Sequence, residues 1–420
     1  MVGGWPGKCG RLLFVRLFVR HQMIQISNLT ARKLALHQQG LLSAKPKFGR
    51  GKKAVLTAIE HLGYVQIDAI SVIQRAHHHT LWSRVPAYQP KYLHHLLSKD
   101  RAIFEYWSHA AAFLPMKDYL YALPVMKKLS TRAKHWYEVN PEFKTKVFET
   151  IKHQGPMYAR DFETPDGHTG GMWSWKPAKQ ALHELFMEGR IAVKSRDSFH
   201  RLYDISERVI PDLTGKAAAQ KQIPSIEEYL VHRCQQAVQA HGLVTIPEIR
   251  YQRYITSSQV TSTLETLGLQ NLITPVKVDG SNRTYFTSEE ILDNVPSRVI
   301  KQLHFLSPFD NAVIQRKRVL DLFDFDYQTE IYYPVNKRKY GYFSLPILYG
   351  TDFIGRMDPK AHRDRGELEI RNLALRSQVT ISDQLVYQLR TRLKEFADFN
   401  GCHTYRITRS RPEVLKSLLN

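Results

Sequence analysis

Residues 55–68 read VLTAIEHLGYVQID, and this stretch decides the fold. Its apolar residues recur at the spacing that lines one face of a helix. Gly63 is expected to end that helix, because glycine readily adopts the left-handed backbone found at helix C-termini. Residues 64–68 then have the character of a strand. The residues on the helical face are Val55, Ala58, Ile59 and Leu62.

The same pattern, an amphipathic helix that ends in glycine and leads into a strand, occurs twice more. The second helix would end at Gly189, before a strand at residues 191–193. The third would end at Gly268, before a strand within residues 272–278. The apolar faces are Ala178, Ala181, Leu182, Leu185 and Phe186 in the second helix, and Val260, Thr263, Leu264 and Leu267 in the third.

Short helices and two-stranded ribbons are expected around these units. The short helices would lie at residues 157–162 and 246–249. Helices followed by a ribbon form the winged-helix variant of the helix-turn-helix, so the sequence predicts an α+β protein with three tandem winged-helix domains. The expected ribbons are residues 191–203, with a turn at Arg196-Asp197, and residues 276–286, with a turn at Asp279-Gly280.

After residue 300 the sequence changes to alternating aromatic and aliphatic runs, which favour a β-rich, barrel-like C-terminal domain. A helix at residues 383–399 and a last strand at 404–407 would complete it. The aromatic and aliphatic runs, in which the strands are expected, are Glu330–Tyr333, Tyr340–Leu348, Phe353–Met357 and Glu367–Leu375. The expected domains are residues 23–125, 126–215, 216–300 and 301–420. Residues 1–22 are expected to be an extension without a functional role, with Met23 as the physiological start of translation.

Composition restricts the class of protein. The 420 residues include 60 Lys and Arg against 39 Asp and Glu, a net charge of +21. This excess suits a polyanion, of which nucleic acid is the commonest and an acidic membrane surface the main alternative. Cys9, Cys234 and Cys402 form no C-x-x-C pair, which excludes a disulfide framework and indicates a reducing setting. The apolar run at residues 12–19 contains Arg16 and is too short to span a bilayer, so no membrane anchor is expected.

Gln66 and Asp68 stand out locally, because side chains two apart on a strand share a face. Val65 and Ile67 would then point into the core, while Gln66 and Asp68 project together from the other face. A neutral amide and a carboxylate held in this way can position and deprotonate a water molecule. The alternative is a strand end whose polar face is merely solvated, and the triplet alone does not decide between the two.

Six segments occur here in one order: Gln66–Asp68, Glu105–His109, Trp173–Pro177, Ser307–Asp310, Tyr340–Phe343 and Gly355–Asp358. Together they closely resemble the bacterial AlkZ and YcaQ family of crosslink-repair DNA glycosylases, and its YcaQ-like branch in particular. The resemblance runs from about Ser27 to about Thr408 and implies three tandem winged-helix domains with a C-terminal β-barrel-like domain. In that family a Gln-aliphatic-Asp motif is catalytic, so the resemblance carries catalysis onto Gln66 and Asp68.

The resemblance implies a monofunctional hydrolase that cleaves the N-glycosidic bond of cationic N7-alkylguanine, unhooks interstrand crosslinks and leaves abasic sites. Such a base leaves without being protonated, so one carboxylate suffices. Asp68 would stabilise the oxocarbenium-like sugar and take a proton from the attacking water, which Gln66 would hold. The expected partner is double-stranded DNA with alkylated or crosslinked guanines, bound by a monomer in the cytoplasm, at the nucleoid, without a cofactor.

Other residues have expected roles in binding. Tyr106, Trp107 and His109 would form a candidate pocket on a strand beside Gln66, or else be buried aromatics with a hydrogen-bonded histidine. Residues 77–79 are three histidines, but adjacent side chains diverge, so no metal is expected. Basic runs suit phosphate contacts, although they are often only a solvated surface. The expected DNA-binding residues are Lys45, Lys47, Arg50, Lys52, Lys53, Lys176, Lys179, Lys194, Arg196 and Arg201.

Two other functions fit parts of the sequence. Three winged helices and a charge of +21 also describe a transcriptional regulator that binds DNA without catalysis. A carboxylate such as Asp68 argues against this reading, because it would repel phosphate. A metal-dependent nuclease built on His77–His79 is the second alternative, and it predicts inhibition by a chelator.

Overall fold

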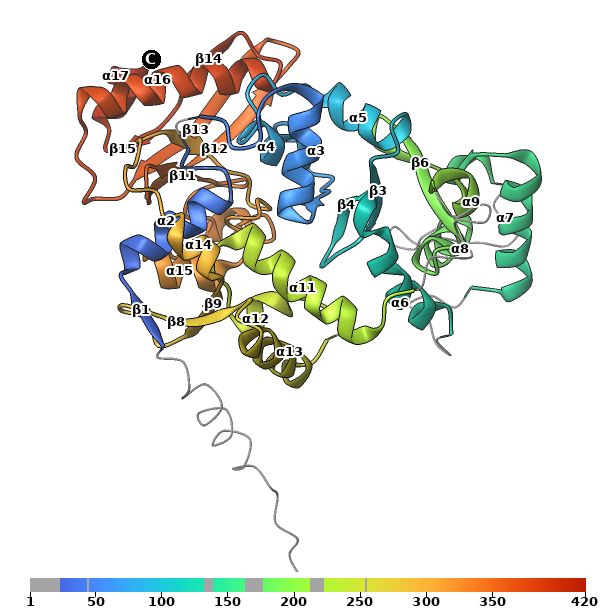
Figure 1. Cartoon of the computed structure of the whole chain (residues 1–420). Helices are drawn as coiled ribbons and strands as arrows, with labels where there is room; N and C mark the ends of the chain where they lie inside the picture. The colour runs from blue at the N-terminus through green and yellow to red at the C-terminus, as the bar shows by residue number, and fades with distance from the viewer. Residues whose placement is uncertain (1–22, 44, 132–138, 163–176, 212–222, 254) are drawn as a thin grey trace, which may run out of the picture. The chain divides into compact units, whose positions relative to one another are not determined.

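The computed structural model describes residues 23–43, 45–131, 139–162, 177–211, 223–253 and 255–420 (Figure 1). Within these residues the chain forms two compact units, each drawn from separate stretches of sequence. The first unit consists of the chain up to Lys47, Ser71–Gln74 and Leu230–Asn420. The second consists of Phe48–Ile70 and Arg75–Tyr229. Both contain helices and sheets, which agrees with the expected α+β class, and the division into four domains stays a prediction.

The second unit contains a three-stranded antiparallel sheet in the order β2-β4-β3. Helix α3 packs against β4 and against α5, while α4 contacts β2 and α5 contacts β3. The elements are α3 (Gly51–Leu62), β2 (Val65–Gln66), α4 (Ala76–Trp82), α5 (Pro90–Ser98), β3 (Ile103–Trp107) and β4 (Ala111–Pro115).

The helix α3 and its glycine stop are confirmed. Val55, Ala58 and the other residues of the expected apolar face are buried. Gly63 has a φ of 75°, and its N–H donates to the carbonyl of Ile59 at 2.9 Å. The strand that follows is shorter than expected, because β2 ends at Gln66 and Asp68 lies beyond it.

A second three-stranded antiparallel sheet of this unit has the order β5-β7-β6. Gly189, with a φ of 75°, ends the buried apolar face of α8 as expected. Two expectations are wrong. Arg196 and Asp197 belong to β6, so the ribbon turns at residues 198–199. Residues 157–162 form a short strand and one 3-10 turn instead of the expected short helix. The elements are α6 (Tyr119–Ser130), α7 (Pro141–Gln154), β5 (Met157–Tyr158), η3 (Ala159–Asp161), α8 (Pro177–Met187), β6 (Ile191–Asp197), β7 (His200–Ile205) and α9 (Ser206–Val209).

In the first unit, β1 pairs in parallel with β8, and β8 pairs antiparallel with β9. The expected face of α13 is buried, but Gly268 lies inside the helix rather than after it. The left-handed residue that follows is Asn271, with a φ of 56°. The elements are β1 (Ile24–Ile26), α2 (Asn28–Gln38), α11 (Ile226–His241), α12 (Ile246–Ile249), α13 (Ser257–Leu269), β8 (Thr274–Val278), β9 (Thr284–Thr287) and α14 (Glu289–Asp293).

The C-terminal part of the first unit is a six-stranded mixed sheet in the order β10-β11-β12-β13-β14, with β15 also paired to β13. Helix α16 has the expected bounds and lies along the sheet (Figure 1). Phe396 of this helix lies 5.5 Å from Phe305 of β10 between ring centroids. Residues 330–333 and 340–344 are loop instead of the expected strands. The elements are β10 (Leu303–Phe305), α15 (Arg316–Phe323), η4 (Val335–Lys337), β11 (Leu345–Tyr349), β12 (Asp352–His362), β13 (Glu367–Leu375), α16 (Asp383–Phe399), β14 (Thr404–Ile407), β15 (Ser410–Arg411) and α17 (Val414–Leu419).

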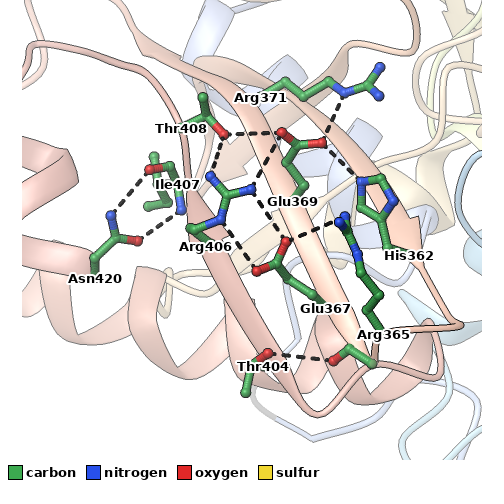
Figure 2. Close-up of polar contacts among 11 residues, drawn as sticks. His362, Arg365, Glu367, Glu369, Arg371, Thr404, Arg406, Ile407, Thr408 and Asn420 are labelled. Atoms are coloured by element: carbon green, nitrogen blue, oxygen red, sulfur yellow. Dashed lines mark hydrogen bonds and ion pairs between the residues drawn. The ribbon is translucent and has the colours of Figure 1, made fainter.

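Strands β12, β13 and β14 carry a network of charged side chains (Figure 2). Glu369 interacts with His362 at 3.0 Å and accepts from Arg371 at 3.3 Å. Arg406 reaches Glu367 at 3.3 Å and Glu369 at 3.7 Å. The hydrogen bond from His362, supported by Arg371, lowers the pKa of Glu369 to about 2. These carboxylates are therefore neutralised by neighbouring cations across three strands.

Candidate active site

Gln66 is held in the second unit by the pairing of β2 with β4, where it lies opposite Ala112. Its side chain is buried, and its Oε1 lies 2.9 Å from Nε2 of His109. A tight turn between β3 and β4 carries the buried His109, whose ring is met edge-on by Tyr64 at 4.9 Å between centroids. Because the amide oxygen can only accept, Nε2 of His109 is the donor. This hydrogen bond fixes the amide plane of Gln66.

The other end of the Gln66 amide is a donor. Within the described residues, the Gln66 nitrogen has no protein partner. A hydrogen bond from that nitrogen can therefore go to a substrate or to a water molecule.

Asp68 lies two residues further along, after the strand has ended. Its Oδ1 accepts from the N–H of Ile70 at 2.8 Å, the short-range contact of an aspartate-initiated turn. Asp68 forms no ion pair with any residue that the structure describes. Burial raises the pKa of Asp68, and the hydrogen bond from Ile70 opposes this only in part. The carboxylate is therefore more basic than an exposed aspartate, and no described residue neutralises its negative charge.

The expected pocket residues are separated by the structure. Tyr106 is buried, donates its hydroxyl to the carbonyl of Met187 at 2.7 Å, and packs on Phe186. Trp107, at the end of β3, is 43% exposed. Strand β4 lies between β2 and the β3 strand that was expected beside Gln66. Of the three residues, His109 is the one that contacts Gln66, and a substrate contact by Tyr106 or Trp107 stays a prediction.

Glu105 was not singled out as a site residue from sequence, although it is a buried carboxylate on β3. Its oxygens accept from Arg196 at 2.8 and 2.9 Å, and Arg201 forms a second ion pair. Burial alone would raise the pKa of Glu105, but the charges of Arg201 and Arg196 outweigh burial and lower the pKa. An acidic residue between Phe104 and Tyr106, in an otherwise apolar strand, was the available signal.

Several of the expected DNA-binding side chains already have protein partners. Arg196 and Arg201 are engaged by Glu105. Lys47 donates to Gln38 Oε1 at 2.6 Å, and burial lowers the pKa of Lys47 to about 8. These interactions compete with phosphate, so DNA contact by these residues stays a prediction.

The remaining expected DNA-binding residues differ in exposure. Lys52 pairs with Asp100 at 2.5 Å, and Lys194 with Asp204 at 3.4 Å. Lys176 and most of the 173–177 segment lie outside the described residues. The exposed cations of the expected set are Lys45, Arg50, Lys53 and Lys179.

The histidine run lies on α4 and is packed into the second unit. His77 is buried and stacks on Phe199 at 6.5 Å, while Nδ1 of His78 lies 2.7 Å from the Tyr88 hydroxyl. Burial, and then the charge of Arg75, lower the pKa of His78 to about 4. No group of three or more His, Cys, Asp or Glu residues arranged to hold a metal occurs in the described part of the chain. None of its described helices is long and apolar enough to cross a membrane.

Comparison with known proteins places the chain in a family. Residues 59–399 match the family described as DNA glycosylase AlkZ-like. The structure is similar to that of the Streptomyces sahachiroi DNA glycosylase AlkZ, with a TM-score of 0.60 over 92% of this chain and 100% of that chain. The two sequences are 13% identical, so this likeness shows the fold alone. Because the family match extends over most of its length, the chain belongs to the AlkZ-like DNA glycosylase family.

Proposed function

We propose that this protein is a monofunctional DNA glycosylase that removes cationic N7-alkylguanines and unhooks interstrand crosslinks joined through such bases. The observation that carries the proposal is the Gln66 amide, oriented by His109, close in sequence to the carboxylate of Asp68, which has no ion pair among the described residues. Membership of a DNA glycosylase family supports it. In this proposal the three small sheets with their helices are winged-helix domains, and a monomer acts on double-stranded DNA without a cofactor.

The chemistry follows from the charge of the leaving group. When the bond between C1′ and N9 breaks, its electron pair moves onto the purine and neutralises the cationic base, so no general acid is needed. The sugar becomes oxocarbenium-like, and the negative charge of Asp68 stabilises it. The water held by the Gln66 nitrogen then forms a bond with C1′ and gives its proton to Asp68.

His109 acts in this scheme as a positioning residue. Its Nε2–H occupies the Gln66 oxygen and thereby turns the amide N–H groups toward the water. Without this hydrogen bond the amide could rotate by half a turn and present its oxygen instead. The raised pKa of Asp68 makes its carboxylate a stronger proton acceptor than an exposed aspartate.

The direct test uses a duplex with a single N7-methylguanine. The wild-type protein should release the base and leave an alkali-labile abasic site. Borohydride should trap no covalent adduct, because the proposed catalytic groups include no amine nucleophile. A protein that binds the duplex without forming abasic sites would instead be a winged-helix regulator.

A second arm of the test addresses the substrate class. A duplex crosslinked by a nitrogen mustard should be unhooked, while uracil excision should stay at background. Uracil departs as an anion that needs stabilisation, which the proposed residues do not supply. Efficient removal of uracil would contradict the dependence on a cationic leaving group.

A further inference from the structure

The first unit displays an exposed loop of aromatic, aliphatic and basic side chains at residues 332–339, here called the 332–339 loop. Tyr332 is 86% exposed, Val335 is 77% exposed and Tyr333 is 40% exposed. Lys337, Arg338 and Lys339 follow directly, and the loop contains no acidic residue. Leaving large apolar side chains in water beside consecutive cations brings the folded chain no stability, so the arrangement points to a partner.

Two buried carboxylates hold the segment that follows the loop. Glu330 Oε2 accepts from the N–H groups of Tyr340 at 2.9 Å and Gly341 at 3.1 Å. Asp358, from β12, accepts from the N–H groups of Tyr342 at 3.2 Å and Phe343 at 2.9 Å. Four successive backbone donors are thus bound to two buried acids, which fixes the course of the chain at this end of the loop.

Other contacts brace the loop and its end. Arg338 Nε donates to the carbonyl of Tyr333 at 2.9 Å, and its guanidinium lies 4.9 Å from the centroid of the Tyr342 ring. Arg356 lies 4.0 Å from the centroid of Tyr340. Arg338 is therefore occupied within the loop. Lys337 and Lys339 are exposed, and Nζ of Lys339 lies 5.3 Å from the centroid of the Tyr340 ring. A rigid base that presents an exposed tip is the usual construction of a binding loop.

We propose that the 332–339 loop is a DNA-contacting element of the C-terminal sheet. Lys337 and Lys339 bind backbone phosphates of duplex DNA, and Tyr332 packs its ring against sugar and base edges in the adjacent groove. The charge favours this partner, because consecutive cations without an acid complement a polyanion, and an aromatic ring complements its apolar faces. The choice of DNA rests on the proposed function.

The test measures binding of the full chain to an undamaged duplex as a function of salt. Lys337→Ala/Lys339→Ala should reduce the slope of log affinity against log salt by about 1.8, since each lost phosphate contact removes about 0.9. The matched control is Lys394→Ala/Lys416→Ala, which removes two exposed lysines from α16 and α17 of the same unit. The control should change the slope by much less.

Tyr332 is tested separately. Tyr332→Ala should weaken binding by about fivefold or more with an unchanged salt slope, and Tyr332→Phe should bind nearly as well as wild type. Unchanged thermal unfolding would show that the variants fold. The proposal is overturned if the double lysine variant keeps the wild-type salt slope, which is the result expected for a loop that binds a protein partner. It is also overturned if the control variant changes the slope by as much as the double lysine variant.

The two proposals fail in different ways. A wild-type protein that forms no abasic sites, but whose salt slope depends on Lys337 and Lys339, would refute the glycosylase and retain the DNA-contacting loop. A wild-type protein that excises N7-methylguanine while the double variant keeps its slope would refute the loop alone.

Discussion

Asp68 and Glu369 are carboxylates in the two units of the molecule, and their surroundings are opposite. Glu369 contacts His362, Arg371 and Arg406 (Figure 2), and the contacts with His362 and Arg371 lower the pKa of Glu369 to about 2. In the part of the chain that the structure describes, Asp68 has a single backbone donor, Ile70, and burial raises the pKa of Asp68. Cations around a carboxylate stabilise its negative charge, and the group then contributes to the fold. A half-buried carboxylate with no cation beside it is more basic, and its negative charge can act on a substrate.

Glu105 shows that burial alone is not the distinguishing property. It lies in the same unit as Asp68 and is more deeply buried, yet Arg196 and Arg201 lower its pKa. Its charge joins β3 to the β6-β7 ribbon. Among the described residues, the two carboxylates differ in whether a cation is paired with them, and the proposed function assigns reactivity to the one without such a partner.

The largest expected effect is on catalysis. Asp68→Asn and Gln66→Ala should each lower base excision by roughly 10² to 10⁴, the usual range for a positioned general base, while DNA affinity is retained. Single-turnover excision of N7-methylguanine and binding to undamaged duplex measure the two. Wild-type excision by Asp68→Asn would remove Asp68 from the mechanism.

The same variant should not lose stability. A group whose pKa is higher in the folded than in the unfolded protein stabilises the fold at a pH below the unfolded-state pKa. This stabilisation is lost as the pH rises through the folded-state pKa. Wherever Asp68 is ionised in the folded protein, its half-buried charge is therefore unfavourable, and Asp68→Asn should unfold at the same temperature or higher. A clear fall in the midpoint would indicate that the carboxylate is structural after all.

Glu105→Gln should show the reverse pattern. Removing the charge leaves the part-buried Arg196 and Arg201 without the Glu105 counterion, which should cost up to about 3 kcal/mol in the free energy of unfolding. Excision per folded molecule should change little. Denaturant unfolding alongside single-turnover kinetics checks this, and a catalytic loss as large as that of Asp68→Asn at unchanged stability would contradict it.

His109→Ala should slow excision by about tenfold, because a buried hydrogen bond of roughly 1 to 1.5 kcal/mol then no longer orients the Gln66 amide. The informative comparison is with Gln66→Ala. If His109 acts through Gln66, the double variant should be no slower than Gln66→Ala alone. Additive losses would instead indicate that His109 contacts the substrate or the water itself.

The smallest effects concern pH and Glu369. As the pH is lowered, the excision rate should fall at a pH above the usual aspartate pKa of about 3.9, because Asp68 must be ionised and its pKa is raised.

Glu369→Gln should leave this acidic limb of the pH profile unchanged and lower the free energy of unfolding by less than about 1 kcal/mol. Since the folded pKa of Glu369 is lowered, that small contribution is present at neutral pH and is lost as pH falls toward 2. A shifted limb in Glu369→Gln would contradict the separation of the two carboxylates.

Local patterns in the sequence were sufficient for much of the secondary structure. The apolar face of α3 and the left-handed Gly63 depend only on neighbouring residues, and α16 has the bounds that were expected for it. The prediction that Gly268 ends its helix was wrong, because a glycine is tolerated inside a helix. The left-handed residue that follows this helix is Asn271. The aromatic run at 330–333 has strand propensity but no paired strand, since two buried acids hold the adjoining chain as a loop.

The sequence by itself determined the candidate catalytic pair and the family resemblance, because these rest on residue type and order along the chain. Tertiary structure alone decided which partners the side chains meet. The bond between Gln66 and His109, the pairing of β1 with β8, and the capture of Arg196 and Arg201 by Glu105 all join residues far apart in sequence. Strand register and packing set such contacts, and no local periodicity encodes them.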